Sequence, residues 1–91
     1  MDSNINNENL ITLDELQIGN CGTVYALNVM GNERRRLLDL GIVRGTVITA
    51  LMKSPLGNPI AYLIRGTEIA LRRKDAARIL LLTETQSPNL Y

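Results

Sequence analysis

Residue types that carry much of protein chemistry are scarce in this chain. Its 91 residues include no histidine, phenylalanine or tryptophan, and one cysteine, Cys21. A single cysteine excludes an internal disulfide bond, and the lack of histidine removes the commonest general base and metal ligand. The carboxylates are not clustered as in a metal site or an acid–base pair. We therefore expect no catalytic residue, no metal site and no cofactor, and we expect Cys21 to be a buried, inert thiol.

Long apolar runs are absent as well. No stretch approaches the ~20 residues that span a membrane, and none follows a basic start as in a signal peptide. These absences predict a cytoplasmic protein. The polar ends lack apolar periodicity, which predicts a disordered tail at residues 1–9, a flexible tail at 84–91 and one domain at 10–83. Ten basic and six acidic residues between Thr12 and Thr83 give this body a net charge of +4.

What the chain does contain is a pattern of short strands. Runs rich in Val, Ile and Thr, bounded by turn residues, predict strands at about 22–29 and 46–53, a hairpin within 62–71 and a last strand at 79–82. A turn is expected at Ser54–Pro59 and one turn of helix at 74–77. Five short strands with one brief helix predict a mainly β fold, a small SH3-like barrel that closes or nearly closes its sheet.

That brief helix is predicted between the first two strands. Asn32 can accept a backbone hydrogen bond in its first turn, and Gly41 can adopt the left-handed conformation that ends it. So short a helix needs tertiary packing, so two of the three leucines Leu37, Leu38 and Leu40 are expected in the core. The third would border a groove between the helix and the sheet.

The hairpin has a register that can be predicted. A two-residue turn at Gly66-Thr67 would have glycine at its first, positive-φ position. The predicted pairs are Arg65 with Glu68, Ile64 with Ile69 and Tyr62 with Leu71. This register puts the four apolar residues on one buried face and the charged pair at an exposed end.

Three motifs stand in order along the chain: L-L-D-L-G-I-x-x-G-T from Leu37, P-L-G-N-P-I from Pro55 and R-G-x-x-I-A-L-R from Arg65. In this combination they resemble the FeoA family, roughly over residues 13–82, with a departure at Asn58, where aspartate is the commoner residue. The resemblance implies an SH3-like, non-enzymatic, cytoplasmic accessory protein of bacterial ferrous iron transport. Its implied partner is the cytoplasmic GTP-binding domain of a FeoB-type transporter, and it would reach the membrane only through that partner.

Four residues are the candidates for partner binding. Leu56, held between a proline and a glycine, is expected to be an exposed hydrophobe presented rigidly, although a turn filler is an equal alternative. Leu40 is the leucine expected at the groove, and with Leu56 it would form a docking site. Arg35 and Arg36 could pair with carboxylates of a partner in bidentate geometry, the alternative being a solvated face.

Two other functions stay open. The helix arginines with Arg44, and a second basic run at 72–78, could bind phosphates, but three tyrosines are the only aromatic residues for stacking on bases. We therefore expect no nucleic acid partner. The domain also resembles the C-terminal module of iron-dependent repressors, which implies a freestanding regulatory domain as an alternative. A small body with an exposed leucine further predicts weak homo-oligomers.

Overall fold

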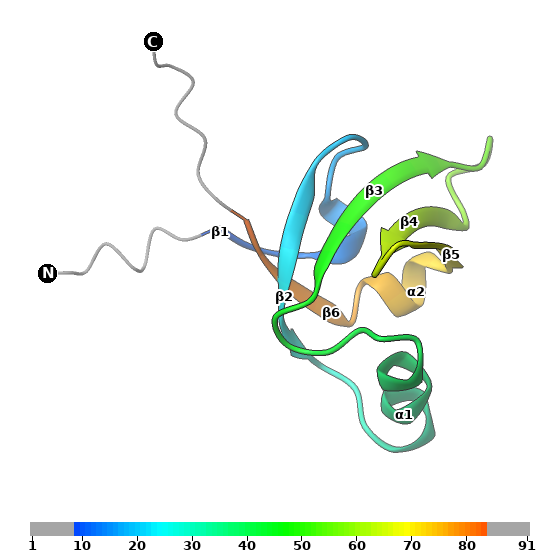
Figure 1. Cartoon of the computed structure of the whole chain (residues 1–91). Coiled ribbons are helices and arrows are strands. Elements are labelled where there is room, and N and C mark those ends of the chain that lie inside the picture. Colours follow the sequence, from blue (N-terminus) through cyan, green and yellow to red (C-terminus); the bar gives the residue numbers. More distant parts are fainter. Residues whose placement is uncertain (1–8, 84–91) are drawn as a thin grey trace, which may run out of the picture.

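The computed structural model describes residues 9–83. Six antiparallel strands form one sheet in the order β1-β6-β2-β3-β4-β5. The elements are β1 (Asn9–Thr12), the 3₁₀ turn η2 (Leu13–Glu15), β2 (Cys21–Leu27), α1 (Gly31–Asp39), β3 (Val47–Lys53), β4 (Ile60–Ile64), β5 (Thr67–Leu71), α2 (Arg73–Ala76) and β6 (Ile79–Thr83). The sheet curls strongly, with α1 below it and α2 between β5 and β6 (Figure 1). The mainly β architecture predicted from the sequence is confirmed.

The sheet has one strand more than the five predicted. β1 pairs with β6, so that Asn9 lies opposite Thr83. Asn9 therefore belongs to the sheet and not to the tail predicted at 1–9, while residues 1–8 and 84–91 lie outside the described part. Within residues 9–83 the edge strands β1 and β5 do not pair with each other. The sheet is therefore curled but unclosed.

The core follows from the alternation of side chains along the strands. In β3 and β4 the inward positions include Ile48, Ala50, Tyr62 and Ile64, which are at most 1% exposed. The Tyr62 hydroxyl donates a hydrogen bond to the backbone carbonyl of Leu13, at 3.3 Å, because a phenol buried this deeply needs a partner. This bond joins the sheet to η2 across the core.

The hairpin turns one residue earlier than predicted. Its turn residues are Arg65 and Gly66, with φ of 53° and 82°, and the pairs are Ile64 with Thr67, Tyr62 with Ile69 and Ile60 with Leu71. The predicted register was wrong by two residues because glycine takes the second positive-φ position of the turn, not the first. A shift of two keeps every side chain on its face. Tyr62, Ile64 and Leu71 are therefore buried and Ile69 half-buried, while Arg65 and Glu68 are exposed as predicted.

α1 also differs from its prediction at one end. It begins at Gly31, and its N-cap residue is Met30, without a side-chain hydrogen bond, so the expected Asn32 cap is wrong. Its other end is confirmed, since Gly41 has a φ of 93° directly after the C-cap residue. Leu37 alone of the three leucines is fully buried, and Leu40 packs partly buried against the core.

Candidate interaction surface

The loop between β3 and β4 is held by its own hydrogen bonds. The backbone N–H of Gly57 donates to the carbonyl of Ser54 at 2.7 Å, and the N–H of Asn58 donates to the Ser54 hydroxyl at 2.9 Å. At the base of the loop the Ser54 N–H donates to the carbonyl of Pro59 at 3.1 Å. Three bonds within six residues give this loop a defined shape.

Asn58 ties the same loop to α2. Its Oδ1 accepts a hydrogen bond from the backbone N–H of Arg73, the first residue of α2, at 3.0 Å. The first N–H groups of a helix have no partner inside the helix, so this contact supplies one from a distant part of the chain. The contact uses an amide oxygen, so in this chain it depends on an acceptor and not on a charge.

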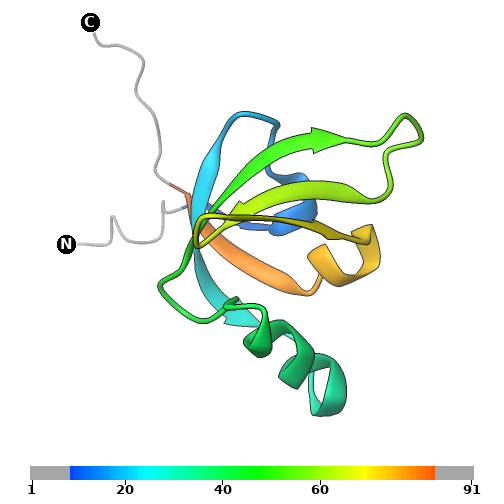
Figure 2. The ribbon, with the colours of Figure 1, turned by 45° about the vertical axis from the view of Figure 1, so that its right-hand side comes forward.

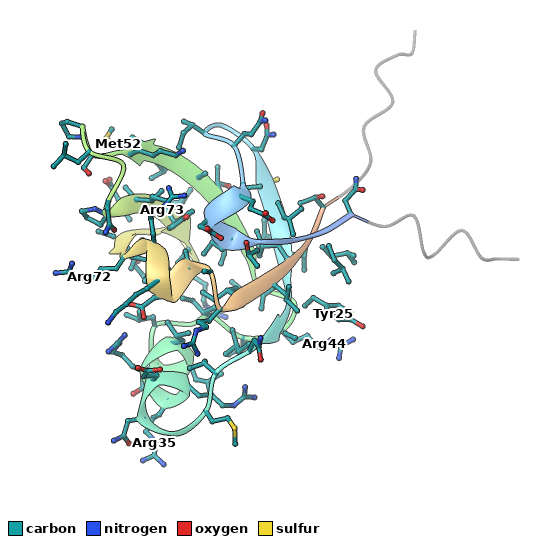
Figure 3. The ribbon with its side chains drawn as sticks, turned by 180° about the vertical axis from the view of Figure 1, so that it is seen from behind. Tyr25, Arg35, Arg44, Met52, Arg72 and Arg73 are labelled. Carbon is teal, nitrogen blue, oxygen red and sulfur yellow. The ribbon has the colours of Figure 1, made fainter. Side chains whose placement is uncertain are left out.

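The fixed loop exposes one leucine. Leu56 is 94% exposed, the highest value among the large hydrophobic residues in residues 9–83, which confirms the predicted exposure. The exposed hydrophobes on the outward side of the strands that carry the loop include Met52 at 60% and Leu63 at 39%. Figure 3 shows Met52 beside the loop. We call Met52, Leu56 and Leu63 the Leu56 surface.

Met52 was not among the residues singled out from the sequence, because strict alternation places it inward with Ile48 and Ala50. A bulge between Ala50 and Met52 shifts the register, so that Met52 lies opposite Ala61, an outward position of β4. Leu63 could have been found, since it alternates with the buried Tyr62 and Ile64 of β4.

A second feature is a hollow of about 360 Å³ bounded by α1, β5 and α2. Its lining includes Leu40, Leu71 and a polar rim, and Arg36 donates to Asp75 across it at 3.2 Å, joining α1 to α2. The full lining is Glu33, Arg36, Leu40, Ala70, Leu71, Arg72, Lys74 and Asp75.

The structure brings together two of the four predicted binding residues. Leu40 and Arg36 line the hollow, whereas Arg35 is exposed and extends from the far side of α1 (Figure 3). Leu56 does not line the hollow, and the loop that carries it lies at the opposite end of the molecule from α1 (Figure 1). The predicted groove between Leu40 and Leu56 is therefore wrong, and the two leucines belong to different surfaces.

Cys21 is exposed, contrary to the buried thiol expected. Within residues 9–83 no three His, Cys, Asp or Glu side chains come together as a metal site would require. No helix in the same range is long and apolar enough to cross a membrane.

Several of the arginines proposed for phosphate binding have partners within the chain. Arg44 lies over the ring of Tyr25 at 5.0 Å, and both side chains are visible in Figure 3. Arg73 approaches Asp14 at 3.9 Å. The basic residues thus divide among separate local contacts.

Comparisons with known proteins agree on one family. The model of the FeoA domain matches residues 11–82. The Fe(2+) transport protein A/Fe(2+) transporter FeoB fusion protein of Porphyromonas gingivalis is 37% identical over 67 residues, which are 74% of this chain but only 8% of the fusion protein.

Solved structures give the same answer. A FeoA-like protein from Clostridium acetobutylicum superposes with a TM-score of 0.79 at 34% identity, over 90% of this chain and 95% of that one. Stenotrophomonas maltophilia FeoA, solved with zinc and described as an SH3 domain protein, gives a TM-score of 0.70 at 29% identity, over 78% and 88% of the two chains. The expected SH3-like fold is thereby confirmed. A manganese-dependent transcriptional repressor matches at 18% identity with a TM-score of 0.75, over 85% of this chain and 43% of the repressor, a likeness of fold alone.

Proposed function

The chain belongs to the FeoA family, and from this membership we propose that it is a non-enzymatic accessory module of ferrous iron transport. In this proposal it binds the cytoplasmic GTP-binding domain of a FeoB-type transporter. Iron is the cargo of that partner and not a ligand of this chain. In this proposal the transporter binds iron and this chain does not, since no three His, Cys, Asp or Glu side chains within residues 9–83 are clustered as iron ligands would be.

The observation that carries the proposal is the fusion protein. A segment 37% identical to this chain is joined there in one polypeptide with a ferrous iron transporter. Joining two domains holds them at a high effective concentration, which serves pairs that act together. A separate chain of this family needs a binding surface to reach the same arrangement.

The Leu56 surface suits that task. Burying a leucine of this exposure contributes about 1.5–3 kcal/mol to binding before opposing costs. Much of the opposing cost of association is the ordering of loops, and the loop around Leu56 is already ordered by its hydrogen bonds. A rigid loop with one protruding leucine therefore keeps more of that contribution as affinity.

Arg35 and Arg36 would contribute to the encounter. Arg35 is exposed and open to a partner's carboxylates, and the Arg36 side chain, although it pairs with Asp75, is still 57% exposed. Exposed charges raise association rates more than they raise affinity. Bound in this way, the module would favour one conformation of the transporter through unequal affinity for its states.

Weak self-association is a second use of the same surface. An exposed leucine beside an exposed methionine gives two copies an apolar patch to share. Sedimentation at increasing concentration would detect the homo-oligomer. Substitution of Leu56 by Asp should abolish it if this patch forms the contact.

The test of the proposed function is a calorimetric titration of this chain with the GTP-binding domain of the transporter from the same organism. Binding is expected, and stopped-flow mixing of the same two proteins should show an association rate that falls as salt rises. An unrelated GTP-binding domain is the control. If the transporter domain produced no more heat than the control, the proposed partner would be wrong.

A further inference from the structure

β5 is an edge strand with unused hydrogen-bonding groups. In a hairpin with a two-residue turn, residues alternate between facing the partner strand and facing away. Here Thr67, Ile69 and Leu71 face β4. The backbone N–H and C=O groups of Glu68 and Ala70 therefore point away from the sheet, and no hydrogen bond within residues 9–83 uses them.

Proteins usually protect such an edge with a proline, a bulge or a covering segment. β5 has no proline and no bulge in its five residues, Thr-Glu-Ile-Ala-Leu, and Glu68 is its one charged residue. Ala70 is exposed and has a small side chain, so another backbone can approach closely at that point.

The open edge lies beside the hollow described above. α1 lies below β5 in the view of Figure 2, and Ala70 and Leu71 of β5 line the hollow together with Leu40, the C-cap residue of α1. Leu71 is 5% exposed and Leu40 is partly buried, so the floor of the hollow is apolar. A strand added to β5 would place alternate side chains over this floor.

The rim of the hollow determines the charge of its occupant. Arg36 and Asp75 pair with each other, and the three remaining charged groups are Arg72, Lys74 and Glu33. Arg72 and Lys74 follow directly after β5 and are exposed, so they lie next to the end of any added strand. Glu68, the one carboxylate on β5 itself, lies nearer the hairpin turn, so the excess of positive charge is confined to the Arg72 end of the strand.

We propose that the β5 edge binds an extended acidic segment of a partner protein as a seventh strand. The backbone groups of Glu68 and Ala70 pair with that segment, an apolar side chain of the segment packs on Leu40, and its carboxylates pair with Arg72 and Lys74. This surface adjoins the Leu56 surface, because Leu63 lies opposite Glu68, but it binds through the backbone of β5 and not through Leu56, so each proposal can fail without the other.

The probe is a synthetic eight-residue peptide of alternating valine and aspartate, titrated into the full chain labelled with ¹⁵N. The expected result is salt-sensitive binding with slowed hydrogen exchange at the amides of Glu68 and Ala70. The matched peptide of alternating valine and lysine should bind at least about tenfold more weakly, a difference of about 1.4 kcal/mol.

Two variants separate backbone pairing from charge. Ala70→Pro removes an outward N–H and no hydrogen bond to β4, so it should abolish peptide binding. Should it unfold the chain, the charge variants decide. Arg72→Glu with Lys74→Glu should weaken binding about tenfold or more, whereas Lys53→Glu, at an exposed residue of β3 outside the hollow, should leave it within about twofold.

Several results would overturn the proposal. They are no binding of the acidic peptide at millimolar concentration, equal binding of the two peptides, and binding that a folded Ala70→Pro variant retains. Protection of Glu68 and Ala70 that grows with protein concentration alone would assign the edge to a second copy of this chain and would also refute it.

Discussion

Replacement of Asn58 by alanine tests how the exposed loop is held. The change removes the acceptor for the Arg73 N–H, a hydrogen bond of 3.0 Å between partners near the surface. An intramolecular hydrogen bond contributes about 0.5–1.5 kcal/mol, and water can replace part of it at an exposed site. We therefore expect a loss of about 0.5–1 kcal/mol in the free energy of unfolding.

Urea unfolding at 25 °C measures that loss. With a slope of about 1 kcal/mol per molar urea for a domain of this size, the midpoint should fall by roughly 0.5–1 M. Asn58→Asp is the matched control, because a carboxylate oxygen accepts the same bond and places negative charge at the start of a helix. That variant should be at least as stable as the parent.

Hydrogen exchange gives a local measure of the same contact. In the alanine variant the amide of Arg73 should exchange faster, while the amides of the buried β4 residues should change only as global stability changes. If the alanine variant unfolded like the parent and the Arg73 amide kept its protection, the proposed link between the loop and α2 would be refuted. The reasoning would also fail if the aspartate variant were the less stable of the two.

Three further results are expected. Gly41→Ala should destabilise the protein by about 1–2 kcal/mol in thermal unfolding, because φ at Gly41 is 93° and a Cβ there would lie 2.6 Å from Cδ of Arg65. Adding Arg65→Ala should relieve part of this cost, and purely additive effects of the two substitutions would contradict the contact. Burial raises the pKa of the Tyr62 hydroxyl above its ordinary value of about 10, so the free energy of unfolding should fall as pH rises above 10. Tyr62→Phe should remove this fall at a cost of about 1 kcal/mol at neutral pH, because it also loses the hydrogen bond to Leu13. If the fall above pH 10 were unchanged in the variant, another group would be its cause. Anaerobic calorimetry with Fe²⁺ should reveal no one-to-one site of micromolar affinity, and finding one would show a metal site that the side-chain arrangement does not predict.

Elements that depend on local sequence signals were predicted well. The predictions that Gly41 ends α1 and that the fold is mainly β were both correct. A positive φ is indicated by the glycine itself, and a strand by the alternation of neighbouring residues. The inward face of the hairpin was also correct despite a wrong turn. The error of two residues preserved the face, since the side-chain period of a strand is two.

Features that depend on distant contacts could not be predicted. β1 pairs with β6, some seventy residues later in the chain, and its four residues are too short a run to predict a strand by themselves. Arg65 adopts a positive φ at the turn, where its side chain also lies against Gly41. Neither effect has a local sequence signature.

The candidate site divides in the same way. The exposure of Leu56 followed from its flanking proline and glycine and is confirmed. The outward position of Met52 depends on a bulge, and the separation of Leu40 from Leu56 depends on where α1 packs, which the sequence did not specify.

The most direct test of the central claim compares two aspartate variants in calorimetric titrations with the GTP-binding domain of the FeoB-type transporter. Leu56→Asp places a charge at the tip of the loop, whereas Ile18→Asp makes the same change at a 44% exposed residue outside the Leu56 surface. We expect Leu56→Asp to weaken binding at least about tenfold, or ~1.4 kcal/mol, with an unchanged melting temperature, and Ile18→Asp to bind like the parent. Equal affinity of the parent and Leu56→Asp would show that Leu56 is not part of the binding surface.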